Sequence, residues 1–279
     1  MTSFQKAVKY FALTLAICLS ISIIGGIFGI CSLILGISSN KPLEYMQTYQ
    51  IFENPRSLDI DISSATLTVK NGETFSDESN VKKLTVEEKN GVLVIKDKNS
   101  FFKSSKNLSI IIYVPKNTEL EKIDISCGAG TFEAEYISAK KISLEFGAGK
   151  SKIDEMHAHT SIEIEGGAGD IEISYGILNN LELNMGVGKI DMKCGIFGNS
   201  DIEFGVGDST LTLLGDDEND YFIKGKRGLG SVTICGKEIE NFPKDNIWSD
   251  SEKNKNKIEI EAGVGDITIS FGKLVQPNS

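Results

Sequence analysis

Histidines, cysteines and a surplus of carboxylates are the side chains of this 279-residue chain that could do chemistry. His157 and His159 are the two histidines, and no cysteine lies near them in the sequence. Zinc sites draw their ligands in close pairs of Cys and His. We therefore expect two surface imidazoles in a loop, and we predict no metal site.

The five cysteines are scattered along the chain. Cys18 and Cys31 lie in a hydrophobic segment, whereas Cys127, Cys194 and Cys235 lie far apart in the remainder. An odd and widely spaced set of cysteines is not typical of a disulfide framework.

Catalysis would need a nucleophile beside a base, or two carboxylates in a pocket that raises the pKa of one of them. The carboxylates of this sequence recur in stripes, without long loops that could wall a cleft, and no Gly-x-Ser-x-Gly motif is present. We expect no enzyme, no catalytic residue, no cofactor-binding residue and no cofactor. The net charge of −10 disfavours nucleic acid as a partner, because it repels phosphate.

A glycine motif organises most of the chain. Gly-x-Gly occurs seven times, and its first glycines are separated by 19, 20, 19, 19, 23 and 35 residues, which indicates a repeat of 19–20 residues with insertions in the last two intervals. The glycine pairs are Gly128 and Gly130, Gly147 and Gly149, Gly167 and Gly169, Gly186 and Gly188, Gly205 and Gly207, Gly228 and Gly230, and Gly263 and Gly265.

Apolar residues alternate with polar ones on both sides of each glycine pair, which is typical of β-strands. Five and three positions before the first glycine stand apolar residues such as Ile162 and Ile164, and they resume four and six positions after it, as at Ile171 and Ile173. The shift in phase predicts a corner at which glycine supplies unusual backbone angles. We predict an all-β parallel β-solenoid with two strands per coil, in which the middle residue of each corner points inward.

Two outward-facing columns carry charge. Directly after the second glycine, Lys150, Asp170, Lys189 and Asp208 alternate in sign, and we interpret this ladder as help with strand register. Before the glycines lies an acidic face. Solvent and salt could balance its charge, as could divalent cations or a basic partner, and we treat it as a speculative binding face: Glu145, Glu163, Glu165, Glu182, Asp201, Glu203, Glu259 and Glu261.

The N-terminal part reads as a membrane anchor. No charged residue lies between Lys9 and Lys41, which is long enough for a spanning helix and longer than the apolar region of a signal peptide, the competing interpretation. The distribution of lysines favours an N-terminus inside and a solenoid outside a cytoplasmic membrane, crossed once. Small residues four apart, such as Gly25 and Gly29, could allow a homodimer through this helix.

The predicted organisation follows from these features. The segments are a cytoplasmic tail (1–9), a transmembrane helix (10–37), a linker (38–57), a β-solenoid (58–272) and a second tail (273–279). Within the solenoid we expect irregular first coils (58–122), regular Gly-x-Gly coils (123–272) and an exposed insertion (236–257).

The repeated Gly-Ala-Gly and Gly-Val-Gly-Asp-Ile motifs, together with Val114-Pro115 and the terminal Gly265-Asp266-Ile267-Thr268-Ile269, resemble a known family. It is the bacterial putative-adhesin family described as domain of unknown function 4097, and the likeness spans about residues 58–272. The resemblance implies a β-solenoid on the bacterial envelope, often behind one transmembrane helix, and offers no catalytic residues to carry over.

The leading hypothesis is a membrane-anchored, non-enzymatic module that is adhesin-like or binds a protein or polymer of the envelope. A regulatory membrane subunit that senses envelope state is the alternative. A β-helix carbohydrate-active enzyme is a third and lesser alternative.

Overall fold

The computed structural model describes residues 47–50, 55–81, 84–97, 108–116, 118–216, 220–226, 228–239 and 256–275. Strands account for nearly all of these residues. None of the residues described forms a helix long and apolar enough to cross a membrane. The predicted tail 1–9 and the predicted transmembrane helix 10–37 lie outside the described ranges.

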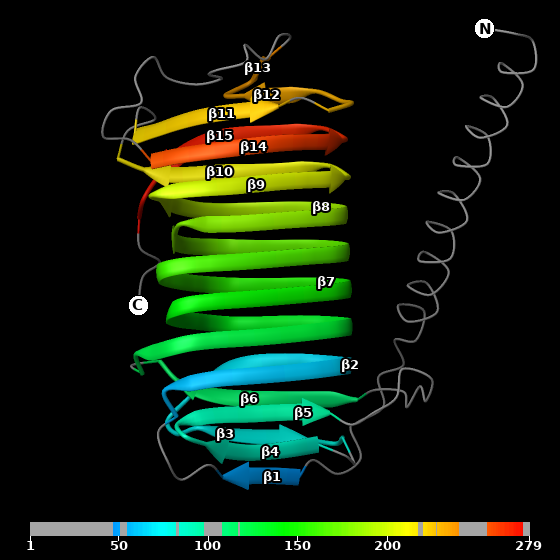
Figure 1. Cartoon of the computed structure of the whole chain (residues 1–279), viewed down its shortest axis with the longest axis vertical. Helices are drawn as coiled ribbons and strands as arrows, with labels where there is room; N and C mark the ends of the chain where they lie inside the picture. Colours follow the sequence, from blue (N-terminus) through cyan, green and yellow to red (C-terminus); the bar gives the residue numbers. More distant parts are fainter. Residues whose placement is uncertain are drawn as a thin grey trace, which may run out of the picture. The chain divides into compact units, whose positions relative to one another are not determined.

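The strands form a stack of coils, which Figure 1 shows side-on. Its central part is built from β7 (Leu120–Asn179) and β8 (Leu181–Phe197), and each coil pairs in parallel with the next. Ile162 pairs with Leu181, and Asp170 pairs with Lys189, each 19 positions further along the chain. The predicted repeat length is therefore the length of one coil.

Each coil has three strand segments rather than the predicted two. Between β7 and β8 the parallel pairing runs over 162–166, 168–173 and 176–179. The third segment carries its own inward-facing residues, such as Leu178, which is fully buried. The sequence does not reveal this segment, because it is short and because residues such as Gly176 interrupt its apolar alternation.

Apolar side chains from all three segments fill the interior of the stack. The predicted inward columns are confirmed, because Ile162, Ile164, Ile171 and Ile173 are each at most 3% exposed. Burial of each such side chain contributes about 1.5–3 kcal/mol before the cost of ordering the chain. Ser200 is the polar exception in its column, and its hydroxyl accepts a hydrogen bond from the Leu181 amide at 3.0 Å.

The glycine corners set how closely the coils approach. The second glycine of every pair has a φ between 137° and 152°, a region that residues with a side chain rarely adopt. A Cβ on Gly188 would lie 1.7 Å from the carbonyl oxygen of Gly169 in the neighbouring coil, and one on Gly147 would lie 2.1 Å from that of Gly128. Both glycines of the motif are therefore required by backbone packing.

The middle residue of each corner points outward, and the prediction of an inward side chain was wrong. Val206 is 44% exposed, Val264 is 47% exposed and Leu229 is 74% exposed. The first glycine faces outward too, so the backbone turns at the corner and places two successive residues on the surface.

The predicted irregular first coils contain one regular coil, formed by β2 (Ser57–Gly72). Its residues Ser57–Ile62 and Ser64–Val69 pair in register with the first coil of β7, although Ser63, Ser64 and Ala65 replace the glycine motif. The opposite edge of β2 pairs with β5 (Val92–Asp97) and β6 (Ser109–Pro115), so a later segment lies outside an earlier one.

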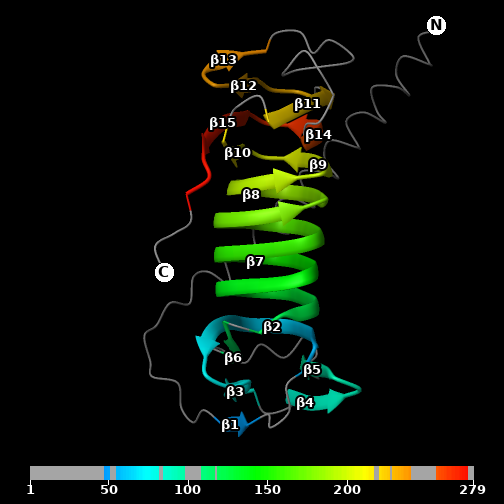
Figure 2. The same cartoon turned by 90° about the vertical axis from the view of Figure 1, so that its left-hand side faces the viewer.

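The other end of the stack has the same interleaved order (Figure 2). The C-terminal coil lies between the coil that ends at Gly215 and the coil that begins at Tyr221, although it comes last in the sequence. The strands involved are β9 (Asn199–Val206), β10 (Ser209–Gly215), β11 (Tyr221–Lys226), β12 (Val232–Ile234), β14 (Asn256–Val264) and β15 (Ile267–Lys273).

Short antiparallel strands lie towards both ends of the stack. They are β1 (Gln47–Gln50) on β3 (Ser76–Ser79), β3 on β6, β4 (Leu84–Lys89) on β5, and β13 (Lys237–Glu238) on β12. A strand paired against the parallel direction ends the repeat, which limits further edge-to-edge pairing.

Replacing Gly188 by Ala should strongly destabilise the stack, because its Cβ would collide with the Gly169 carbonyl at a backbone angle that alanine disfavours. We expect a loss of more than about 3 kcal/mol in the free energy of unfolding, measured by denaturant titration. Thr210→Ala on the exposed face is the matched control, with an effect within about 0.5 kcal/mol. Equal effects of the two variants would contradict the packing role of the corner.

Candidate functional site

A groove of about 490 Å³ runs beside the glycine corners across four neighbouring coils. One wall carries Glu145, Glu165, Asn184 and Glu203. The floor is formed by Phe146, Gly166, Met185 and Phe204, next to the first glycine of each corner. The groove exists because that glycine faces outward without a side chain.

The floor of the groove is apolar and well packed. Phe146, Met185 and Phe204 are each 7% exposed, so their side chains turn towards the interior while one surface remains open. Gly166 occupies the equivalent position in the coil between Phe146 and Met185, and a Cβ there would lie 2.4 Å from Met185 Sδ. These floor residues were not among the predicted site residues, although each stands directly before the first glycine of its motif.

The predicted acidic face forms the outer side of this groove. Glu163, Glu182, Asp201 and Glu259 stand in register on neighbouring coils, which places like charges on adjacent strands. Such neighbours repel each other. At the outermost coil Lys226 pairs with Glu261 and lies 3.9 Å from Glu259. Of the eight predicted face residues, Glu145, Glu165 and Glu203 line the groove itself.

An apolar ridge borders the groove on its other side. We define the corner ridge as the middle residues of the stacked corners: Ser64, Ala129, Ala148, Ala168, Val187, Val206, Val264 and Leu229. Its side chains grow from small to large along the stack. Val206, Val264 and Leu229 are three of the four exposed large apolar side chains among the residues described.

The charge ladder stands two positions after the corner ridge. Lys150, Asp170, Lys189 and Asp208 are all exposed, and Asp170 lies in register with Lys189. No ion pair within 4.0 Å joins these four side chains to one another or to other described residues. The alternation of sign is present, but the proposed contribution to register stays a prediction.

Aspartates of the same column do bond to the neighbouring backbone near the C-terminal end. Asp208 Oδ1 accepts a hydrogen bond from the Asp266 amide at 3.2 Å, and Asp266 Oδ1 accepts bonds from the amide and hydroxyl of Ser231. The bonds from the Ser231 hydroxyl and amide hold the pKa of Asp266 below its usual value. The aspartate of the Gly-Val-Gly-Asp motif therefore links its coil to the next one by hydrogen bonds.

The two histidines lie in strand β7, and the prediction of a loop was wrong. The His157 side chain is 16% exposed, and its Nε2 lies 2.9 Å from Glu155 Oε1. Its ring centroid lies 5.6 Å from that of Tyr136 and 6.1 Å from that of Tyr175. Part of this cluster is buried, and burial raises the pKa of Tyr175.

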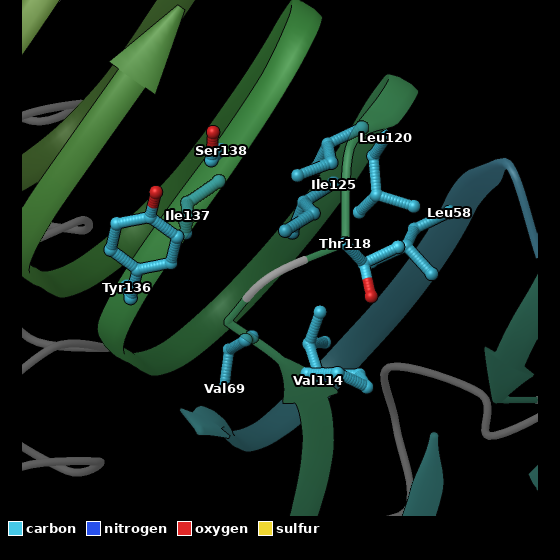
Figure 3. A pocket seen from close by; sticks show the side chains of 11 residues that line it. Leu58, Val69, Val114, Thr118, Leu120, Ile125, Tyr136, Ile137 and Ser138 are labelled. Atoms are coloured by element: carbon cyan, nitrogen blue, oxygen red, sulfur yellow. The ribbon is translucent and has the colours of Figure 1, made fainter. Parts of the chain in front are cut away.

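The enclosed cavities are small. Figure 3 shows the one between β2, β6 and the start of β7, where Leu58, Val69, Ile125 and Tyr136 converge. Its volume of about 10 Å³ is room for about one water molecule. This cavity is a packing defect between two coils rather than a ligand site.

No group of three or more His, Cys, Asp or Glu side chains suited to a metal ion occurs within the described part of the chain. Cys127, Cys194 and Cys235 are free thiols. Burial is the main cause that raises the pKa of Cys127 to about 12, and it raises that of Cys194 further. Neither of these thiols is an activated nucleophile.

Calcium at millimolar concentration should leave the melting temperature of the full chain unchanged within about 1 °C, because the acidic side chains stand in extended columns and not in a ligand cage. Thermal unfolding with calcium, and with matched ionic strength from sodium chloride, tests this. A calcium-specific rise of several degrees would contradict it.

A buried carboxylate near the other end of the stack was also missed. Asp77 of β3 is fully buried, and neither carboxylate oxygen has a hydrogen-bond partner among the described residues. Burial raises its pKa from 3.8 to about 6. Because the fold favours the protonated form of Asp77, the contribution of this side chain to stability is greatest below about pH 4, falls as the pH rises towards 6, and stays reduced above that value.

Replacing Asp77 by Asn should therefore stabilise the protein at pH 8, by up to about 3 kcal/mol, and have little effect at pH 3.5. Thermal unfolding across this pH range measures the difference. Asp191→Asn, at an exposed position, should show no such pH dependence. A destabilised Asp77→Asn variant at pH 8 would contradict an uncompensated buried charge.

The sequence profile of the Toastrack DUF4097 family matches residues 56–274. The chain belongs to this family, as the glycine motifs predicted. No curated protein matches the chain.

Several solved bacterial structures are similar to this chain. A putative adhesin from Bacteroides fragilis is 15% identical, with a TM-score of 0.48, over 82% of this chain and 96% of that chain. A putative cell adhesion protein from Clostridium sporogenes is 20% identical, with a TM-score of 0.37, over 82% and 99%. A putative lipid binding protein from Parabacteroides distasonis is 14% identical, with a TM-score of 0.35, over 82% and 97%.

Proposed function

We propose that the chain is a non-enzymatic, adhesin-like interaction module of the cell envelope, and that it binds its partner through the glycine-corner face. This face comprises the groove and the corner ridge. The observation that carries the proposal is the exposure of Val206, Val264 and Leu229 on three neighbouring coils.

Exposed apolar side chains are common singly, but a contiguous row on a surface that is otherwise charged indicates contact with another molecule. The outward columns on both sides of the ridge are rich in Asp, Glu and Lys. Polar side chains around an apolar centre are the usual arrangement of a binding surface. The groove adds a depression beside the ridge, into which a partner's side chains fit.

The stack holds this face rigidly. Each ridge residue except Ser64 sits on a backbone corner whose glycines pack against the neighbouring coil, so the spacing between ridge residues is fixed at about 4.8 Å. A rigid surface loses little entropy on binding. The rigidity of the face therefore favours its use as a docking surface. The predicted anchor at 10–37 would hold the module at the cytoplasmic membrane with the solenoid outside.

Making the ridge polar should abolish partner capture. We expect Leu229→Gln combined with Val264→Thr to reduce in-cell crosslinking of the full-length protein to its partners at least tenfold, because the variant removes the apolar centre of the face. Thr210→Gln combined with Thr268→Gln changes two exposed positions away from the ridge and should retain the partners. Unchanged thermal unfolding of both variants is the control for folding. Equal capture by the parent and the ridge variant would contradict the proposal.

A further inference from the structure

We propose that the partner of the corner ridge is a second copy of this chain, bound antiparallel about a two-fold axis midway between Ala168 and Val187. This inference rests on the proposed function of the face. It follows from two patterns along the stack, the size of the ridge side chains and the charge of the ladder side chains. When a second copy is rotated by 180° about this axis, large ridge residues meet small ones and positive ladder residues meet negative ones.

The pattern of size comes first. Four of the eight ridge residues precede the axis in the stack and are small, and four follow it and are larger. An antiparallel copy places Ala168 opposite Val187, Ala148 opposite Val206, Ala129 opposite Val264, and Ser64 opposite Leu229. Every large side chain then meets a small one, along a contact about 34 Å long at about 4.8 Å per coil.

The pattern of charge has the same centre. An antiparallel copy about this axis brings Lys189 to the partner's Asp170, and Lys150 to the partner's Asp208. These four side chains are exposed and lack an ion pair among the described residues. The two-fold axis produces each contact twice, which gives four opposite-charge contacts. Further out, Thr131 faces Asp266 and Thr66 faces Ser231, so no like charges meet in this column.

Other arrangements match less well. Moving the axis by half a coil, to lie at Val187, makes Lys189 face itself, and moving it by a full coil in the same direction makes Asp170 face the partner's Asp266. Moving it by a full coil in the other direction leaves Val264 and Leu229 without a ridge residue opposite them. A parallel pair would place Leu229 against its own copy at one end and Ala129 against its own copy at the other. The central antiparallel register avoids each of these conflicts.

The contact is narrow. In the next outward column Glu172 would approach the partner's Asp191, which restricts close contact to the corner ridge and the charge ladder. Interfaces of this kind are weak singly, but many copies on one surface act together. Because the chain enters each stack at the same end, an antiparallel pair has its two entry ends far apart.

Charge exchange tests the proposal directly. The full chain in mild detergent at about 0.15 M salt should dimerise with concentration in sedimentation equilibrium, since this salt screens the general repulsion between copies of charge −10. Lys189→Asp should weaken dimerisation more than about tenfold, because it creates like-charge contacts. Adding Asp170→Lys should restore the affinity to within about threefold of the parent.

The matched control is Lys193→Asp, which changes the net charge equally on an exposed position of the same coil, outside the contact. It should alter dimerisation by less than about threefold. A parent chain that stays monomeric to about 1 mM, a failure of the exchange to restore pairing, or an equal effect of the control would overturn self-pairing. If partner capture still depends on Leu229 and Val264, the proposed function stands with a different partner; if it does not, both fall.

Discussion

The close contact of backbone with backbone at the glycine corners is the constraint on which the rest of the structure depends. Carbonyl oxygens of one coil occupy the space where Cβ atoms of the next would lie, as between Gly169 and Gly188. The coils can therefore stack in register without side chains between them at this edge. Alternation on either side then places apolar residues inside, and the core follows from the register.

The same constraint shapes the surface. A glycine that faces outward leaves a groove, and the residue after it is lifted onto a ridge. Stacking in register repeats these features coil by coil, so a single position in the repeat becomes a column on the surface. The corner geometry depends on the glycines, so the ridge and ladder positions are free to vary from coil to coil. Their side chains change along the stack, from Ala148 and Lys150 to Val206 and Asp208, and the two ends of the face therefore differ.

The repeat length, the parallel pairing and most of the buried columns could be predicted from the sequence, because glycine spacing and alternation report directly on coil length and strand phase. The outward orientation of the Val206 side chain could not be predicted, because a corner residue lies between two strands and follows the alternation of neither. The interleaved order at both ends was also hidden, because Ser57–Gly72 lacks the glycine motif and pairing between distant segments leaves no local signal. His157 was wrongly predicted to lie in a surface loop, and the burial of Asp77 was not predicted, because the burial of both side chains depends on neighbouring coils.

Intermolecular distances between spin labels test the account most directly, because they report the axis of the pair as well as its existence. Labels are placed singly on the full chain at two exposed positions of one column outside the corner ridge, Asp191 in the coil next to the axis and Thr268 two coils beyond it. The antiparallel pair predicts an axial separation between equivalent labels of about 5 Å at Asp191 and about 24 Å at Thr268, at 4.8 Å per coil. Equal separations at the two positions would mean a parallel pair and would contradict the account.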